Sequence, residues 1–305
     1  MKNFIKNITG AKKFADYLRE ENDKSKILSA KNLINHIKQI KVPANIHDVE
    51  FSVFSQWGDD GIIQYLIHAI NIENETFIEF GVGNYLEANT RFLLINNNWK
   101  GLIFDGSEKN IHYVQNDSIY WKFDLTAKPL FITKSNINEA IKSAGFEGKI
   151  GLLHIDIDGN DYWIWEHIQV VDPEIVIMEY NSVFGNKSAI SVPYKDDFFV
   201  SKEHFSNLFF GASLKAMIHL ADKKGYSFVG SNSAGNNAYF VRNDKMNFLK
   251  SMSAEEGYVK CKFRQNRNAN AEFSFEPDTE KINQCGSLMV VNVENGESAS
   301  LNNYL

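Results

Sequence analysis

Short apolar runs alternate with stretches of helical spacing along most of the chain. The runs predicted to form parallel strands are Thr76–Phe80, Gly101–Asp105, Tyr120–Phe123, Ile150–Ile157 and Ile175–Glu179. Between and beyond them, apolar residues recur every three or four positions, as in Ile62–Ile70, Asn89–Leu94 and Leu214–Ala221. This alternation predicts an α/β fold, with a mostly parallel sheet and helices on both of its faces.

Two further strands are predicted at Tyr226–Gly230 and Asn237–Arg242. The segment between them is too short for a helical crossover, so we expect the two strands to pair antiparallel and bring the sheet to seven strands. After about residue 245 the pattern fades into polar sequence, with one more strand predicted at Ser287–Val293.

The first 41 residues form a separate block. They hold ten Lys or Arg and four Asp or Glu, a net charge of +6, whereas the remainder carries −12. Two groups of apolar residues at helical spacing predict amphipathic helices that end near Pro43; the groups are Phe4, Ile5, Ile8, Phe14, Tyr17 and Leu18, then Ile27, Leu28, Leu33, Ile34, Ile37 and Ile40. Such helices pack on the neighbouring domain, join subunits into a homo-oligomer, or lie on an anionic membrane.

Overall charge and composition narrow the classes of partner. The formal charge of −6 provides no basic footprint for nucleic acid. No stretch approaches 18 uninterrupted apolar residues, so we predict no transmembrane segment. Two cysteines and the lack of a signal-like start favour a cytoplasmic protein.

A glycine turn follows the first predicted strand. Gly81 and Gly83 let the backbone approach a ligand beyond the carboxyl end of a strand, where open α/β sheets bind their ligands. A dinucleotide-binding motif would have a third glycine where Leu86 stands. Glu79, two positions before Gly81, instead matches the acidic turn of S-adenosylmethionine-dependent methyltransferases. A purely structural turn is the alternative.

Acidic residues also end the next two predicted strands. Asp105 lies about twenty residues past the glycine turn, where a carboxylate can accept both ribose hydroxyls. Asp124 follows the third predicted strand, where it could reach an adenine amino group. Either residue could instead cap a helix.

The fourth predicted strand carries His154, Asp156 and Asp158 at alternate positions, and Asp161 follows shortly after. Alternation places the first three on one face, and the next strand adds Glu179 and Asn181. Buried acids need a cation, hydrogen-bond partners or a catalytic role. Oxygen ligands suit Mg²⁺ or Ca²⁺, so the metal-ligand candidates are Asp156, Asp158, Glu179 and Asn181. The alternative is a polar network without a metal. For His154, the alternative to a catalytic role is a hydrogen-bonded place in the core.

Two other segments attract attention. The loop at residues 54–61 holds Gln56, Asp59 and Asp60 just before a helix, where the acids either cap that helix or help to bind a ligand. Aromatic residues crowd the segment after the fifth strand and either roof a pocket or belong to the core: Phe184, Tyr194, Phe198, Phe199, Phe205, Phe209 and Phe210.

Taken in order, these motifs resemble one family. The ordered set comprises Ser55–Gly61, Phe80–Gly83 with Glu87, Asn89, Thr90 and Arg91, Gly101–Asp105, His154–Tyr162 and Gly225–Gly230. It is similar to class I S-adenosylmethionine-dependent methyltransferases, particularly the FkbM-like methyltransferases of sugars and surface glycans. The resemblance covers roughly residues 51 to 245.

The resemblance implies a Rossmann-like sheet of seven strands, preceded by a helical extension (1–50) and followed by a C-terminal extension (246–305). It implies a methyl donor over Gly81 and Gly83, with Asp105 on the ribose and Asp124 near the adenine. Gln56 or Asp60 would hold the amino-acid end of the donor, and the family motif adds Asn89 and Thr90 to the cofactor-binding set.

The expected activity is O-methylation of a small-molecule or saccharide acceptor, with S-adenosylmethionine as cofactor and Mg²⁺ as a second candidate. Asp158, with Asp156 or His154, would activate the acceptor hydroxyl, and Asn181 would orient it. Two alternatives remain. One is an NAD-dependent oxidoreductase, disfavoured by Leu86 and the antiparallel strand. The other is a non-catalytic cofactor-binding scaffold, disfavoured by the cluster of acids.

Overall fold

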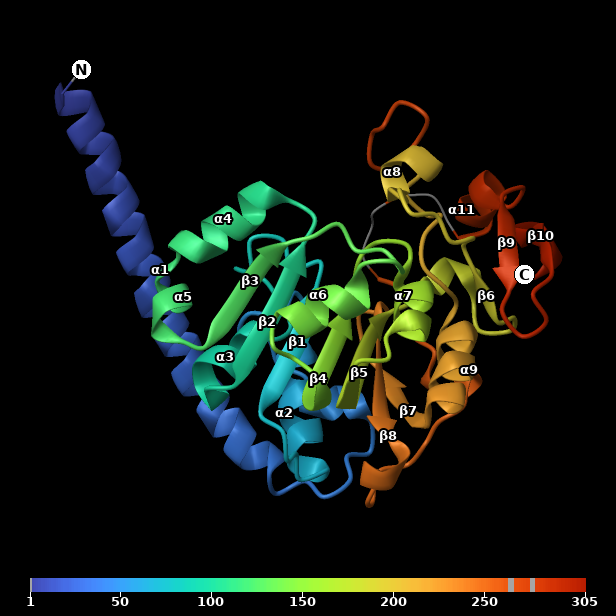
Figure 1. The fold of residues 1–305 in the computed structure, drawn as a ribbon, viewed down its shortest axis with the longest axis horizontal. Coiled ribbons are helices and arrows are strands. Elements are labelled where there is room, and N and C mark those ends of the chain that lie inside the picture. Colours follow the sequence, from blue (N-terminus) through green and yellow to red (C-terminus); the bar gives the residue numbers. More distant parts are fainter. Residues whose placement is uncertain (1, 263–265, 275–277) are drawn as a thin grey trace.

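The computed structural model describes residues 2–262, 266–274 and 278–305, and side chains within these ranges except those of residues 2–13, 16, 278 and 279. A seven-stranded sheet runs through the middle of the chain (Figure 1). Its strands are β1 (Thr76–Phe80), β2 (Lys100–Asp105), β3 (Leu125–Pro129), β4 (Gly148–Ile155), β5 (Val171–Glu179), β7 (Tyr226–Ser231) and β8 (Asn237–Arg242).

The strand order is β3-β2-β1-β4-β5-β8-β7. β8 runs antiparallel to both of its neighbours, β5 and β7, while the pairs among β1 to β5 are parallel. This arrangement confirms the predicted Rossmann-like sheet of seven strands with an antiparallel last strand. Chain order reverses on either side of β1 and β4, so a ligand crevice is expected at their carboxyl ends.

Side chains alternate between the two faces of the sheet and pack into an apolar core on each face. In β4, Leu152 joins one core and Leu153 the other. The first core is covered by α2 (Asp59–Ala69), α3 (Arg91–Asn97), α4 (Glu108–Asn116) and α5 (Ser118–Lys122). The second is covered by α6 (Ile137–Ser143), α7 (Asp161–His167) and α9 (Leu214–Lys224). Because both faces are covered, the central strands read as nearly continuous apolar runs.

The predicted third strand is wrong. Residues 120–122 belong to helix α5 and Phe123 is its C-cap; the N-cap Asp117 accepts a hydrogen bond from the backbone N–H of Ile119. The real strand, β3, starts at Leu125 and includes Lys128 and Pro129. It lies at the sheet edge, where proline and polar residues are tolerated, so it lacks the apolar signature of the central strands.

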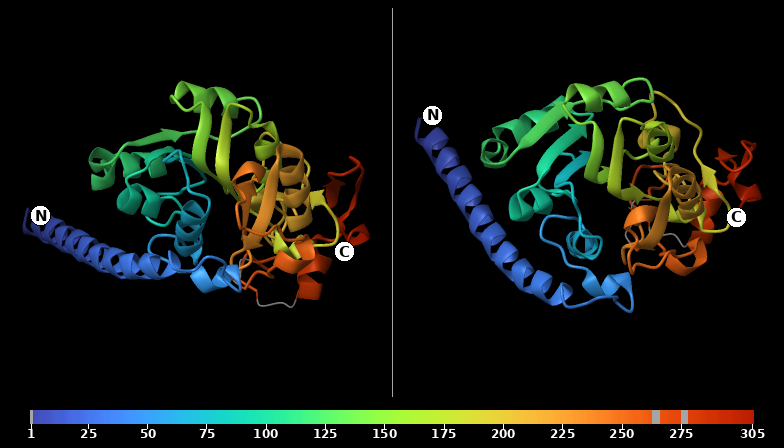
Figure 2. Two further views of the ribbon diagram at one scale, coloured as in Figure 1. Left: turned by 90° about the horizontal axis from the view of Figure 1, so that it is seen from below. Right: turned by 60° about the horizontal axis from the view of Figure 1, so that its bottom comes forward.

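The N-terminal segment forms one long helix, α1 (Lys2–Ile37), where two groups of helical spacing were predicted, and a 3₁₀ turn, η1 (Ile46–Val49), follows. The helix runs along one side of the body and its N-terminal half projects away from it (Figures 1 and 2). Ala30 and Ile34 are buried with Val53, Phe54 and Phe92 of the body. The predicted apolar positions at Phe4, Ile5 and Ile8 have side chains outside the described set.

Residues after β8 join the aromatic segment in a second, three-stranded sheet of order β10-β9-β6. Its strands are β6 (Ile190–Ser191), β9 (Met289–Asn292) and β10 (Ser298–Ser300). The remaining short helices are η2 (Ser182–Phe184), α8 (Val200–Glu203), η3 (Asn243–Lys245), α10 (Ala254–Gly257), α11 (Asp278–Cys285) and η4 (Leu301–Asn303). Among the aromatic residues of this segment, Phe184, Phe198 and Phe209 are buried here, whereas Phe199 and Phe205 are exposed.

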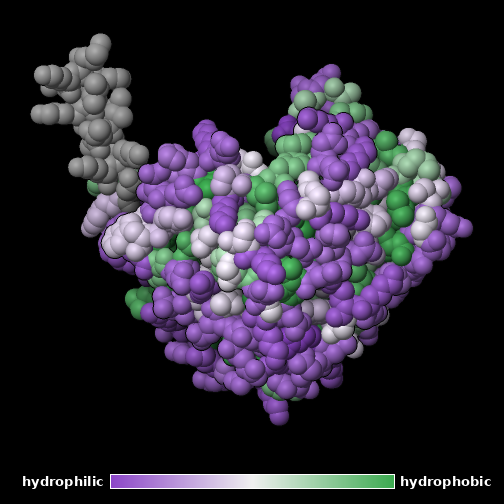
Figure 3. All heavy atoms as spheres, in the orientation of Figure 1, coloured by the Kyte–Doolittle hydropathy of each residue, from purple (hydrophilic) through white to green (hydrophobic). Residues whose placement is uncertain are grey.

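The face seen in Figure 3 is mostly hydrophilic, and its hydrophobic residues lie in small separate groups. The surface dips at the top of this view, between the α4 side and the projecting α8 segment. Within the described ranges, no helix is long and apolar enough to cross a membrane.

Candidate ligand and active site

The glycine turn after β1 is tightly packed against the end of β4. Gly81 has a φ of +72°, and a Cβ atom there would come within 1.7 Å of the carbonyl oxygen of Asp156. Gly83, with a φ of +55°, has open space around it. Its backbone N–H donates to Asp105 Oδ2 at 2.7 Å. The turn is therefore fixed by Asp156 at Gly81 and by Asp105 at Gly83, and the space beside Gly83 is open to a ligand.

Glu79 organises the segment that follows this turn. Its carboxylate accepts hydrogen bonds from the backbone N–H groups of Asn89 and Thr90, both at 3.0 Å, and from the Thr90 hydroxyl. Its Oε1 also lies 2.9 Å from Nδ1 of His154. Burial acts to raise the pKa of Glu79, but His154 and these donors outweigh it and hold the pKa below its usual value.

His154 is buried between Glu79 and the side chain of Asn89, whose Nδ2 lies 3.2 Å from Nε2 of the ring. Burial acts to lower the pKa of His154, yet the hydrogen bond and charge of Glu79 raise it overall. Both ring nitrogens have partners, as expected for a positioning residue. Thr90 is fully buried behind Glu79 and supports it.

Neighbouring acids at the start of α2 face different ways. Asp60 Oδ2 accepts three backbone hydrogen bonds, from Val53, Phe54 and Ser55, and so shapes the preceding loop; burial raises the pKa of Asp60 to about 6. Asp59 Oδ1 accepts hydrogen bonds from Asn232, Asn237 and Tyr239. Its other oxygen, Oδ2, is buried and has no hydrogen-bond partner among the described residues.

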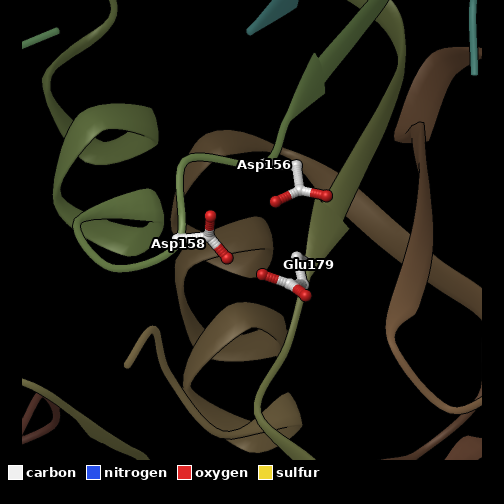
Figure 4. A group of neighbouring side chains, drawn as sticks. All are labelled: Asp156, Asp158 and Glu179. Atoms are coloured by element: carbon white, nitrogen blue, oxygen red, sulfur yellow. The ribbon is translucent and has the colours of Figure 1, made fainter. Parts of the chain in front are cut away.

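Three carboxylates converge beyond β4 and β5 (Figure 4). One oxygen each of Asp156, Asp158 and Glu179 lies within 4.8 Å of the other two. β4 ends at Ile155, so the two aspartates stand in the following loop. Asp158 meets the others because its φ of +55° turns the backbone, and strand alternation does not extend that far.

Crowding and burial change the acidity of this cluster. Burial, followed by the charges of Asp156, Asp158 and Asp161, raises the pKa of Glu179 well above its usual value. Burial and the charge of Asp158 likewise raise the pKa of Asp156. Acids raised in this way accept a proton more readily near neutral pH than ordinary carboxylates do.

Two predicted members of this site have other roles. Asn181 Nδ2 donates to the carbonyls of Leu208 and Phe210, and its Oδ1 accepts from the backbone of Val183. Its amide is therefore engaged with backbone and is not turned toward the three carboxylates. Asp161 accepts the backbone N–H groups of Ile157 and Gly159, at 2.8 and 2.9 Å, and so orders the loop that carries Asp158.

The structure also contradicts the prediction that Asp124 ends the third strand near the adenine. This residue precedes β3, so it lies at the amino ends of the parallel strands, and its carboxylate pairs with Lys100, the first residue of β2, at 3.8 Å. The glycine turn lies at the opposite, carboxyl ends. Asp105, by contrast, ends β2 beside that turn, and its Oδ1 accepts hydrogen bonds from Ser107 N and Asn110 Nδ2.

Two cavities meet at the glycine turn and share Gly81, Gly83 and Asp156. The first, which we call the aromatic cavity, has a volume of about 450 Å³ and is lined by Gly81, Gly83, Phe104, Asp105, Gly106, Ser107, Leu130, Phe131, Ile132, Asp156, Ile157, Asp158, Asn160, Phe198 and Phe199. At its mouth the rings of Phe131 and Phe199 stack with centroids 5.5 Å apart.

The second, which we call the acidic cavity, has a volume of about 310 Å³ and is lined by Gln56, Trp57, Asp59, Glu79, Gly81, Val82, Gly83, Asn84, Glu87, Ala88, Asn89, His154, Asp156, Asn236 and Asn237. Within the described part of the chain, neither cavity has a lysine or arginine in its lining. Asp60, Thr90, Asp124 and Asn181 line neither of them.

Sequence reasoning missed several lining residues that the tertiary structure brings in, among them Phe131, Asn236 and Asn237. For Asp59 and Asp60 the sequence left helix capping and ligand binding open; a helix turns by about 100° per residue, so the two side chains cannot face the same way. Asn236 and Asn237 lie at the β7–β8 hairpin and the start of β8, far along the chain from the glycine turn. No local signal distinguishes them from ordinary turn residues.

Comparison with known proteins gives distant structural similarity. No family model matches the chain, and no curated protein matches its sequence. Among solved structures, an S-adenosylmethionine-dependent methyltransferase from Clostridium acetobutylicum ATCC 824 is 11% identical, with a TM-score of 0.39 over 60% of this chain and 90% of that one.

An O-methyltransferase from Bacillus cereus in complex with SAH is 12% identical, with a TM-score of 0.40 over 69% of this chain and 91% of that one. The DszA carbon methyltransferase is also 12% identical, with a TM-score of 0.39 over 61% and 53% of the two chains. These similarities are too low to assign an activity or a substrate to this chain.

Proposed function

We propose that this chain is an S-adenosylmethionine-dependent methyltransferase that acts on a hydroxyl group. The observation that carries the proposal is the pair of cavities that meet at Gly81 and Gly83, one aromatic with Asp105 at its edge, the other acidic. S-adenosylmethionine has a nucleoside at one end, an ammonium group at the other and a sulfonium between them. An aromatic wall suits the adenine, and acidic walls suit the two cations.

The same charges argue against a dinucleotide. The pyrophosphate of NAD would be expected at the glycine turn. There it would meet Asp105, whose carboxylate accepts the backbone N–H of Gly83, with no lysine or arginine in the described lining to compensate. Repulsion between like charges in a partly buried site disfavours that ligand, and the oxidoreductase alternative with it.

We assign roles to residues by the cavity that each one lines. Asp105 would accept the ribose hydroxyls, and Phe131 and Phe199 would flank the adenine. Asp59 would bind the ammonium group of the amino-acid end, because its buried Oδ2 is unused, and Gln56 would help at the exposed side of the same cavity. A buried acceptor atom without a partner is costly, and a bound ammonium would remove that cost.

The chemistry then needs alignment and a proton acceptor. When bound, S-adenosylmethionine supplies a methyl carbon whose bond to sulfur breaks as the acceptor oxygen attacks in line, leaving a neutral thioether. The acceptor's hydroxyl proton must leave in the same process. We propose that Asp158, the exposed member of the carboxylate cluster, takes it, while Asp156 and Glu179 share a proton and hold Asp158 in place.

A divalent cation is an alternative way to acidify the acceptor. The three carboxylates are close enough to hold Mg²⁺ through one oxygen each, and carboxylate oxygens are ligands that this ion prefers. When bound there, Mg²⁺ would lower the pKa of a hydroxyl on the acceptor.

We propose a saccharide or a glycan precursor as the acceptor because the sequence resembles methyltransferases that act on sugars and surface glycans.

Calorimetry tests the donor assignment. We expect S-adenosylhomocysteine and S-adenosylmethionine to bind the full chain with one-to-one stoichiometry and NAD⁺ to give no heat. An Asp59→Asn variant should weaken both sulfur ligands but leave the affinity for adenosine unchanged, because adenosine lacks the amino-acid end. Binding of NAD⁺ in place of S-adenosylhomocysteine would overturn the proposal.

A further inference from the structure

A third cavity lies beside the carboxylate cluster and is walled in part by the end of the chain. It has a volume of about 240 Å³, and we call it the C-terminal cavity. One wall is the segment that leaves β5, residues 179–187. A second wall comes from residues 258, 260–261, 266, 281–282 and 304–305, and residues 207, 208 and 210 contribute a third side. In Figure 1 these C-terminal elements stand to one side of the strand ends.

Hydrogen bonds tie the walls together, so the cavity is a built feature of the fold. The hydroxyl of Tyr258 donates to the carbonyl of Ser182 at 2.7 Å, and that of Tyr180 donates to the carbonyl of Val259. The backbone N–H of Cys261 donates to Ser182 Oγ at 3.0 Å. These bonds bring residues nearly eighty positions apart into one wall.

The C-terminal cavity borders the proposed reaction centre at two residues. Glu179 lines it and also belongs to the carboxylate cluster. Asn236 lines both this cavity and the acidic cavity. A molecule bound here can therefore bring a hydroxyl group next to Glu179, the member of the carboxylate cluster that lines this cavity.

The charge of the C-terminal cavity differs from that of the other two. Its described lining holds three lysines, Lys187, Lys260 and Lys281, against one carboxylate, Glu179. The two cavities at the glycine turn contain acids and no lysine. Amides of Asn186, Asn207 and Asn266 and the aromatic rings of Phe184, Phe210 and Tyr304 complete a lining suited to a polar, ring-shaped molecule.

We propose that the C-terminal cavity is the acceptor site and that its acceptor bears an anionic group, a phosphate or a carboxylate, in addition to the methylated hydroxyl. The lysine ammonium groups bind the anion, while Glu179 and its neighbours face the hydroxyl. Methylation at this site rests on the proposed function, but recognition of an anion does not. The last 60 residues thereby gain a role in selecting the acceptor.

Cys261 provides a direct readout of occupancy because it lines the cavity, whereas Cys285, the other cysteine, is buried in the C-terminal core. The rate of Cys261 alkylation is followed by peptide mass spectrometry, with glucose, glucose 6-phosphate, glucuronate and pyrophosphate as probes. Glucose 6-phosphate or glucuronate should slow alkylation about tenfold at about ten times its Kd, and glucose should not. Whichever of the two protects identifies the anion.

The lysines are then tested by substitution. Lys187→Ala with Lys281→Ala should raise the concentration needed for protection about tenfold or more, because charge-assisted hydrogen bonds are lost. Lys223→Ala is the matched control, since Lys223 is exposed on α9 and lines none of the three cavities. Equal protection by glucose, no protection by any probe, or the same loss in the Lys223 variant would overturn the proposal.

Binding of S-adenosylhomocysteine to the same preparation separates the two hypotheses. If the donor product binds and no anion protects Cys261, the acceptor proposal fails alone. If an anion protects Cys261 and S-adenosylhomocysteine does not bind, the anion site stands and the methyltransferase assignment fails.

Discussion

The carbonyl oxygen of Asp156 lies directly against the α-carbon of Gly81, so close that a Cβ atom on Gly81 would come within 1.7 Å of it. This contact joins the ends of β1 and β4 at the point where the two proposed donor cavities meet. A glycine is required there for two reasons: the backbone has a φ of +72°, and a side chain has no room.

Gly81→Ala should therefore disrupt both folding and donor binding. We expect the free energy of unfolding to fall by more than the backbone strain of about 1–3 kcal/mol, because the clash with Asp156 adds to that strain, and we expect undetectable binding of S-adenosylhomocysteine. Gly83→Ala is the control: its φ is +55°, but nothing lies within 4 Å of the added atom, so only the backbone cost remains. Chemical denaturation and calorimetry compare them. Equal effects would show that the Asp156 contact is unimportant.

Asp105→Asn tests the proposed ribose contact. The substitution keeps the side chain's shape but removes the charge, and loss of charge-assisted hydrogen bonds should weaken donor binding by about 1.5–3 kcal/mol. Asp124→Asn, at the opposite, amino ends of the strands, should leave the affinity unchanged. Calorimetry that finds the two variants equally affected would refute the assignment.

The carboxylate cluster is tested by chelation and substitution together. If Asp158 is the proton acceptor, methyl transfer should survive EDTA but fall at least about a hundredfold in Asp158→Asn. If the cluster binds Mg²⁺, EDTA should abolish turnover and added Mg²⁺ should restore it. Asp222→Asn, an exposed position on α9, is the control. Full activity of Asp158→Asn with and without chelator would contradict both roles.

The raised pKa values of Asp156 and Glu179 predict a pH dependence of stability. Between the ordinary carboxyl pKa of about 4 and the raised folded-state values, the folded protein binds more protons than the unfolded chain. The free energy of unfolding should therefore fall as pH rises through this window.

Glu179→Gln removes one titrating group, so its unfolding free energy should vary less with pH than that of the parent. Denaturation without donor, at several values from about pH 5 to about pH 8, measures the difference. Asp161, with a pKa raised to about 6 by burial, has the same sign but is present in both proteins. Parallel curves for the two proteins would contradict the proposed proton sharing.

The exposed half of α1 predicts self-association. Phe14, Tyr17 and Leu18 are 61%, 57% and 51% exposed, whereas Ile34 packs on the body. Phe14→Ser with Leu18→Ser should lower the oligomeric mass seen by light scattering and leave the melting temperature unchanged. Ile34→Ser should do the opposite and lower the melting temperature. An unchanged mass in the first variant would exclude this surface as a subunit contact.

Much of the sheet could be read from the sequence because central strands carry a strong local signal. β1 and β8 match their predicted bounds, and β2, β4, β5 and β7 differ by a few residues at their ends. These strands are buried on both faces, so each shows a run of apolar, often β-branched residues. β3 was missed because an edge strand with Lys128 and Pro129 lacks that signal, while most of the aromatic-rich segment 120–123 belongs to helix α5.

The candidate site, too, could be predicted from the sequence only in part. The sequence predicted that the glycine turn, Asp105 and the acids at the ends of β4 and β5 lie close together, because the carboxyl ends of parallel strands meet on one side of an α/β sheet. It could not decide between Asp59 and Asp60, or recognise that the Asn181 amide binds backbone. Those outcomes depend on which side chains the cavity walls leave unpaired, and the walls come from segments far apart in the chain, brought together only by tertiary packing.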